Sequence, residues 1–256
     1  MREILRSLFL TFNGHFKSLS NDVHIINSHF FSDNIPYSIN RFESQLKYLS
    51  DKVVFCSLDE AVSLIENKVI VDKPYITFTY DDGFCECYEH IVPVLDKYEI
   101  KAAFFINPNF IDGDSNYQSS FMDKVCVSNK KPMTWGQLKE LSNNGHIIGA
   151  HTMDHVDLGQ SFSIEELEYQ LGECKRVIEQ KVGNECNHFA YPFGQLQHLN
   201  EKSLSCAQNH FKYIYSGTNF KSYSSFHGSV INRRHIEPFW PISHMKYFLS
   251  FNKVFR

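Results

Sequence analysis

YITFTYDDGF, residues Tyr75–Phe84, is the stretch that decides the fold. Apolar and polar residues alternate as far as Tyr80, which is the period of a β-strand, and two aspartates and a glycine follow. Adjacent strand residues point to opposite faces, so folding alone gives no reason for two like charges at the end of a strand. We therefore expect Asp81 and Asp82 to have a chemical role.

Strands and helices alternate outward from this stretch. Further β-type runs lie at 101–106, 146–152, 188–193 and 213–217, and helical patterns lie near 86–98, after Thr134, from Ser163 to about Gly183, and near 200–210. Repeated strand–helix units predict an α/β fold with a parallel sheet or barrel. Upstream, 39–52 and 57–68 have amphipathic helical patterns, so we expect residues 1–70 to be a helical lead-in packed on the barrel, within a single domain of residues 1–256 that has its core motifs at 75–240.

The amino-acid composition argues against some classes of function and favours one cellular compartment. The 256 residues carry a net charge of -4, with scattered lysines and arginines, which argues against nucleic-acid binding. Seven cysteines, an odd number without disulfide or zinc-finger spacing, predict reduced thiols, with a metal pair at Cys85 and Cys87 as the weaker alternative. Because the N-terminal stretch also lacks a secretory cleavage site and a membrane-spanning length, we expect a cytoplasmic protein.

Three polar motifs each follow a predicted strand: TYDDG at 79–83, HTMDH at 151–155 and AYPFG at 190–194. In α/β barrels the carboxyl ends of the strands converge on the face that carries the chemistry. One aspartate with His151 and His155, spaced i, i+4, makes a three-ligand set of the kind that catalytic zinc uses. The second aspartate is then free to act as a base toward water.

The motifs, in this order and with these intervening elements, resemble the polysaccharide deacetylases of carbohydrate esterase family 4, most clearly from Tyr75 to Gly194. The resemblance implies a distorted (β/α) barrel of about seven strands and a divalent metal, usually Zn²⁺. It also implies a role for each motif residue. Asp81 would be the catalytic base, Asp82, His151 and His155 the metal ligands, the Phe193 backbone N–H an oxyanion donor, and Tyr191 and Pro192 substrate contacts.

The sequence also departs from the family pattern. Many relatives carry an arginine that orients the base aspartate at the position of Ala190, and Tyr80 replaces a phenylalanine. The family's late histidine, a general acid, has no clean counterpart, and His235 is the best candidate by position, ahead of His227 and His29. Arg233 or Arg234 is a candidate contact for a sugar carboxylate or phosphate, with a solvated arginine as the alternative.

The function predicted from these residues is metal-dependent removal of an N-acetyl or similar N-acyl group from an amino sugar, which yields a free amine and acetate. With a cytoplasmic location, the substrate is expected to be an intermediate of surface polysaccharide biosynthesis. The alternatives are a sugar-binding barrel that has lost turnover, motivated by Ala190 and the missing acid, and a hydrolase of a non-sugar amide. The C-terminal segment 245–256 is either a closing helix, which we favour, or a peripheral membrane contact.

Overall fold

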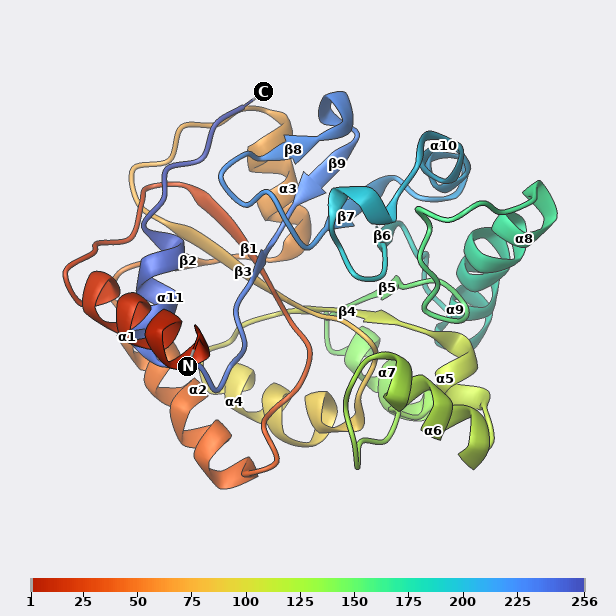
Figure 1. Cartoon of the computed structure of the whole chain (residues 1–256), viewed down its shortest axis with the longest axis horizontal. Helices are drawn as coiled ribbons and strands as arrows, with labels where there is room; N and C mark the ends of the chain where they lie inside the picture. The colour runs from red at the N-terminus through yellow and green to blue at the C-terminus, as the bar shows by residue number, and fades with distance from the viewer. Residues whose placement is uncertain (1, 256) are drawn as a thin grey trace.

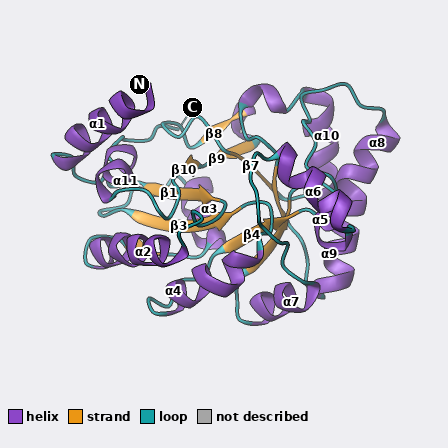
Figure 2. Cartoon of the chain, turned by 60° about the horizontal axis from the view of Figure 1, so that its bottom comes forward, coloured by secondary structure: helices purple, strands orange, loops and turns teal. Residues whose placement is uncertain are grey.

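A computed structural model describes residues 2–255, in which one curled sheet is surrounded by helices (Figures 1 and 2). The strand order is β10-β1-β3-β4-β5-β6-β7-β9-β8, with β2 beside β3. All pairings are parallel except that of β8 with β9. The strands are β1 (Val23–Ser28), β2 (Val54–Phe55), β3 (Tyr75–Tyr80), β4 (Ala103–Ile106), β5 (Ile147–Ala150), β6 (His188–Ala190), β7 (Tyr213–Ser216), β8 (Ser224–Ser225), β9 (Val230–Asn232) and β10 (Arg234–His235).

Apart from α1 and α11 near the two ends, the helices lie in the connections between strands, as the sequence pattern predicts. They are α1 (Arg2–His15), α2 (Ile35–Ser50), α3 (Leu58–Glu66), α4 (Val92–Asp96), α5 (Pro108–Asp112), α6 (Ser115–Lys124), α7 (Trp135–Asn143), α8 (Ile164–Glu168), α9 (Cys174–Val182), α10 (Glu201–His210) and α11 (Ile242–Leu249). Thr134 and Ser163 form capping boxes at the starts of α7 and α8. Gly183, at φ +93°, ends α9 in the left-handed conformation that glycine adopts without strain. These predicted helix boundaries are confirmed.

The predicted α/β fold is confirmed, with seven strands of three or more residues. The sheet forms a half-barrel, because no pairing among residues 2–255 joins the edge strands β10 and β8. Alternate residues of one strand enter different cores: Phe104 packs with the large cluster that contains α4 and α7, and Phe105 packs with the cluster that contains α3. Both faces are therefore covered, and the open rim at the carboxyl ends of the strands is free to hold a site.

The prediction that residues 1–70 form a helical lead-in is wrong in one respect, because β1 is part of the sheet. It is fully buried and pairs with β3 over its whole length, from Val23 opposite Tyr75 to Ser28 opposite Tyr80. Strands buried on both faces lose the alternation of apolar and polar residues, and VHIINS has no such alternation to detect. The assignment of the whole chain to one domain stays a prediction.

Candidate active site

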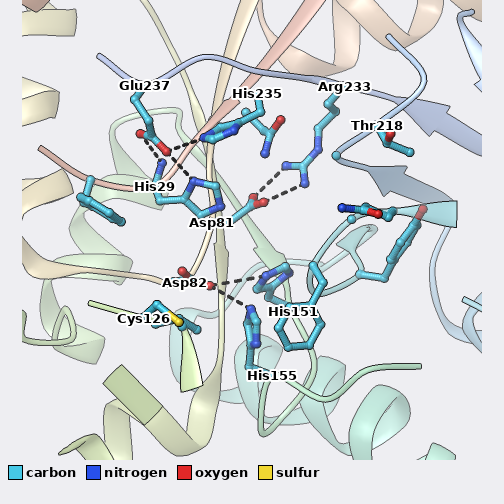
Figure 3. Close-up of a pocket in the computed structure, with 18 of the residues that line it drawn as sticks. His29, Asp81, Asp82, Cys126, His151, His155, Thr218, Arg233, His235 and Glu237 are labelled. Carbon is cyan, nitrogen blue, oxygen red and sulfur yellow. Dashed lines mark hydrogen bonds and ion pairs between the residues drawn. The ribbon is translucent and has the colours of Figure 1, made fainter. Parts of the chain in front are cut away.

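A cavity of about 500 Å³ opens at the carboxyl ends of the strands (Figure 3). Among the residues predicted from the sequence, those that line it are Asp81, Asp82, His151, His155, Tyr191, Phe193 and His235. Two others lie elsewhere: Pro192 is not part of the lining, and His227 lines a different cavity near β8. His29 and Arg233, which were further candidates from the sequence, line it as well, and Glu237 adds another carboxylate.

Asp82, His151 and His155 form a buried carboxylate–imidazole triad. Asp82 Oδ1 lies 3.5 Å from His151 Nε2 and 3.4 Å from His155 Nε2, and it accepts no hydrogen bond from the described residues. Tetrahedral zinc with bonds of about 2.0–2.2 Å keeps its ligand atoms about 3.3–3.6 Å apart. Both nitrogens are thus too far from the Asp82 oxygen for strong hydrogen bonds and have the separation from it that one shared cation requires.

The surroundings of His151 prepare its ring as a metal ligand. Nδ1–H donates to the Ala190 carbonyl oxygen at 2.6 Å, which leaves the Nε2 lone pair facing Asp82. Burial lowers the pKa of His151 to about 4, so the ring is neutral near neutral pH. Position 190 therefore takes part in the site through its backbone, although the side chain there is alanine.

The loop after β5 is held in an unusual conformation. Thr152 and His155 have φ values of +63° and +51°, in the left-handed region that side chains other than glycine rarely adopt. Asn107, which follows β4, fixes this loop by donating from Nδ2 to the carbonyl oxygens of His151 and Thr152. Sequence reasoning missed Asn107, whose one signal is a polar side chain at the carboxyl end of a strand.

The turn after β3 explains the adjacent aspartates. Asp82 and Gly83 have φ values of +72° and +77°, and the Asp81 N–H donates to the Ser28 carbonyl oxygen at 2.9 Å. A Cβ at position 83 would lie 3.0 Å from Ile106 Cγ2, so the close approach also favours glycine. Two successive left-handed residues redirect the chain, and both carboxylates reach the same cavity from neighbouring positions.

Asp81 forms a buried two-pronged ion pair with Arg233, from the end of β9. Nη1 lies 2.7 Å from Oδ1 and Nη2 lies 2.8 Å from Oδ2, and the arginine is 1% exposed. Burial raises the pKa of Asp81, but the Arg233 charge and hydrogen bonds outweigh it and hold that pKa well below its usual value. Arg233, a candidate contact for a substrate anion, thus has both terminal nitrogens engaged by Asp81. An arginine from another strand occupies the place next to the base that Ala190 cannot fill.

Arg234, the other arginine considered for substrate binding, points away from the cavity. Its guanidinium carbon lies 4.1 Å from the Phe220 ring centroid and 3.4 Å from the Phe248 ring centroid. Stacking between two aromatic faces is a stabilising use of a guanidinium group. Arg234 is thus neither a solvated surface residue nor a substrate contact.

Glu237 joins two histidines on the opposite wall of the cavity. Glu237 Oε1 lies 2.7 Å from His29 Nδ1 and 2.7 Å from His235 Nε2, and Figure 3 shows His29 between Glu237 and Asp81. Burial raises the pKa of Glu237, yet the charge of His29 and both hydrogen bonds bring it down to about 2. Burial lowers the pKa of His29, yet Glu237 and the charges of both aspartates bring it up to about 9. His29 thus keeps a proton beside the predicted base.

The third motif supplies a free backbone donor. Phe193 and Gly194 have φ values of +62° and +65°, and the Gly194 carbonyl oxygen accepts a hydrogen bond from the Gly217 N–H at 2.8 Å. Within residues 2–255, no backbone carbonyl accepts the Phe193 N–H. The Phe193 ring lies 4.7 Å from the His155 ring, between centroids, so this donor is adjacent to the triad.

Comparisons with known proteins agree with the geometry. A family model described as polysaccharide deacetylase matches residues 68–211. In Bacillus subtilis (strain 168), "Putative polysaccharide deacetylase YxkH" is 25% identical over 169 residues, which cover 65% of this chain and 53% of that protein. "Uncharacterized protein YlxY" of the same organism is 25% identical over 171 residues, 64% of this chain and 47% of that protein. The chain spans about half the length of these relatives.

Solved structures have the same fold. The deacetylase PplD of Streptococcus pyogenes, in complex with acetate, has a TM-score of 0.69 at 20% identity, covering 91% of this chain and 99% of that one. IcaB from Ammonifex degensii has a TM-score of 0.68 at 18% identity, covering 91% and 98%. The family model matches more than half of the chain, and its residues include all three motifs. The chain therefore belongs to the polysaccharide deacetylase family.

Proposed function

We propose that the protein is a metal-dependent N-deacetylase of an amino sugar. The observation that carries this proposal is the buried Asp82–His151–His155 triad, set at metal-ligand spacing beside a second carboxylate that an arginine keeps ionised. We propose Zn²⁺ as the cation, since two imidazoles and one carboxylate with an open fourth position are a ligand set of catalytic zinc. When bound there, the cation would polarise the acyl oxygen and lower the pKa of water.

The residues of the chain have separate roles in this proposal. Asp81 accepts the proton of the attacking water, because its ion pair with Arg233 keeps it ionised and oriented. The Phe193 N–H donates to the oxygen that gains negative charge as the water adds to the acyl carbon. When the C–N bond breaks, one of the two histidines on Glu237 donates a proton to the leaving nitrogen. The products are a free amine and acetate.

His29 and His235 are both candidates for the acid, and charge favours His29. Its pKa of about 9 keeps it protonated at neutral pH, and it lies toward Asp81 in the cavity (Figure 3). The two reasons for the sugar-binding alternative were the alanine at position 190 and the missing acid. Arg233 places a positive charge beside the base Asp81, and the two histidines on Glu237 are candidate proton donors. An active enzyme is therefore better supported than a sugar-binding barrel.

We further propose that the substrate is an N-acylated amino sugar, an intermediate of surface polysaccharide biosynthesis, and that the protein acts in the cytoplasm. The seven cysteines, all free in the structure, support a reducing compartment. Cell fractionation tests the location, and recovery of the protein from the periplasm or the medium would exclude it.

The decisive experiment compares zinc-loaded wild type with Asp81→Asn on N-acetylated, N-formylated and cyclic amide compounds. We expect acetate release from an N-acetyl amino sugar and a fall of about 10²–10⁴-fold in the variant, with zinc content unchanged. Turnover of a cyclic amide alone would favour the non-sugar hydrolase. Tight zinc and saccharide binding without any acetate from the wild type would favour the sugar-binding barrel.

A further inference from the structure

Helix α1 has its large apolar side chains on the outside of the molecule. The exposed side chains of this helix and the residue after it are Ile4 (66% exposed), Leu5 (61%), Leu8 (62%), Phe9 (53%), Phe12 (70%) and Phe16 (74%). Their spacing, i, i+1, i+4, i+5, i+8 and i+12, puts them on one side of a helix. We call this surface the α1 outer face. A contiguous apolar face of this kind on a protein surface marks an interaction site.

The opposite side of α1 is anchored to α11, so the orientation of the helix is fixed by specific contacts. Thr11 Oγ1 lies 3.1 Å from His244 Nε2, and the Ser7 carbonyl oxygen lies 3.2 Å from the same nitrogen. Gly14 allows close approach, because a Cβ there would lie 1.8 Å from the Ser243 carbonyl oxygen. Small and polar residues thus face the protein, and rotation that buried the outer face would break these contacts.

Apart from Glu3 in the first turn of α1, the charged residues of α1 and α11 are basic. None of the 29 acidic residues lies within 4–21 or 238–255, the two stretches that contain the rest of α1 and all of α11, although the whole chain is acidic. Arg6 and Lys17 are exposed here, and the Lys246 ammonium group donates to the His15 carbonyl oxygen at 2.8 Å. An apolar face flanked by basic residues, with no carboxylate within 4–21 or 238–255, complements an anionic lipid surface.

We propose that the α1 outer face docks on an anionic membrane surface, with the helix lying in the plane of the lipid headgroups. No helix among residues 2–255 has the length and apolar content needed to cross a bilayer, and 14 residues extend only about 21 Å. A second copy of the chain is a poorer occupant. Two-fold pairing through this face would bring Arg6 and Lys17 of one copy near the same basic residues of the other, with Glu3 the one acidic residue within 2–21.

The inner side of α1 lies close to the candidate active site. The Arg6 guanidinium carbon is 6.0 Å from the Trp240 ring centroid, and that ring is 5.2 Å from the His235 ring. A cavity of about 330 Å³ beside α1 shares Ser32 and Phe239 with a neighbouring cavity, which in turn shares Phe30 and Cys126 with the active-site cavity. Docking would therefore place the lipid surface at one end of a series of adjoining cavities.

This inference rests on α1 and α11 alone, not on the proposed reaction, and a sedimentation experiment tests it without any substrate. Full-length protein is mixed with vesicles of phosphatidylcholine, alone or with an equal amount of phosphatidylglycerol. We expect wild type to sediment with the anionic vesicles, less at high salt, and weakly with phosphatidylcholine alone. The double variant Leu8→Ser/Phe12→Ser should bind more than about tenfold more weakly, and Lys17→Glu about fivefold more weakly.

Ile70→Ser is the matched control, because Ile70 is 95% exposed and lies after α3, outside the α1 outer face. It should bind as wild type does. If the double variant melts at a lower temperature than wild type, Lys17→Glu alone decides the result. Absence of sedimentation with anionic vesicles, or equal binding by wild type and the deciding variant, overturns the proposal. So does a wild-type dimer in sedimentation velocity that Leu8→Ser/Phe12→Ser converts to monomer.

Discussion

The cavity contains two clusters of the same composition, each with one buried carboxylate and two imidazoles. Around Glu237 the nitrogen–oxygen distances are 2.7 Å, which are hydrogen bonds. Around Asp82 they are 3.4 and 3.5 Å, which leave room for a cation between the three atoms. We infer from this difference of less than 1 Å that one cluster binds a metal and the other binds protons.

A second contrast concerns how the carboxylates stay ionised. Asp81, beside the Asp82–His151–His155 triad, is paired with Arg233, whose charge does not titrate in the accessible pH range. Glu237 is paired with two histidines, and at least one of them, with a pKa of about 9, loses its charge in mild alkali. The positive charge that pairs with Asp81 is thus permanent, whereas the positive charge that pairs with Glu237 depends on pH.

The largest expected effect comes from removing a ligand of the Asp82–His151–His155 triad. Asp82→Asn should abolish zinc retention in equilibrium dialysis and lower acetate release by more than about 100-fold, since even partners outside the ligand shell are worth 10–100-fold. Glu237→Gln is the matched control, because it alters the other carboxylate of the same cavity and should retain zinc. Equal zinc loss in both variants would contradict the division of roles between the clusters.

The next effect is on stability. Arg233→Met leaves the buried Asp81 carboxylate unpaired, which should cost about 3–5 kcal/mol in the free energy of unfolding measured with urea. Adding Asp81→Asn to this variant removes the unpaired charge, so the double variant should regain most of that stability. A double variant no more stable than Arg233→Met would show that Arg233 acts through packing on Phe105 and Tyr215 instead.

The two clusters also differ in how far the sequence predicts them. Asp82, His151 and His155 belong to two short motifs, each at the end of a strand with a clear pattern, and the family resemblance assigned their roles. Local pattern was enough there, because neighbouring parallel strands bring their carboxyl ends together. The same reasoning gave the α/β fold and the caps at Thr134 and Ser163.

His29 and Glu237 are brought together by a pairing that no local pattern encodes. β1 pairs with β10 across more than 200 residues, and neither strand shows the usual alternation of apolar and polar residues. Arg233 posed a different difficulty. Its position at a strand end indicated a site residue, but nothing in the sequence says that it reaches across the rim to Asp81. Long-range strand pairing, rather than residue type, was the missing information.

The third effect is the pH dependence of the Glu237 cluster. The His29 pKa rises from 6.5 unfolded to about 9 folded, so its contribution to stability is fully present below pH 6.5 and is lost as pH rises through 9. It should amount to less than about 3 kcal/mol, because the ring is partly exposed. Urea unfolding at pH 6 and at pH 10 should show this loss in wild type and little of it in Glu237→Gln. Equal losses in both proteins would contradict the assignment.

The last comparison, which contains the smallest expected change, separates the two histidines of that cluster. The side chain of His235 is 42% exposed and that of His29 is 27% exposed, and the charges of both aspartates help to raise the pKa of His29. If His29 is the acid, His29→Asn should lower acetate release by about 10²–10⁴-fold. His235→Asn should cost only about tenfold, because it removes one hydrogen bond to Glu237 and leaves the other. A hydrogen bond to a charged group is worth about 1.5–3 kcal/mol, and we expect the lower value, about tenfold in rate, for a side chain that is 42% exposed. The alkaline limb of the rate profile should stay near pH 9 in His235→Asn, because His29 keeps its partner.

A larger loss in His235→Asn than in His29→Asn would reverse the assignment and make His235 the acid, with Glu237 still holding both rings.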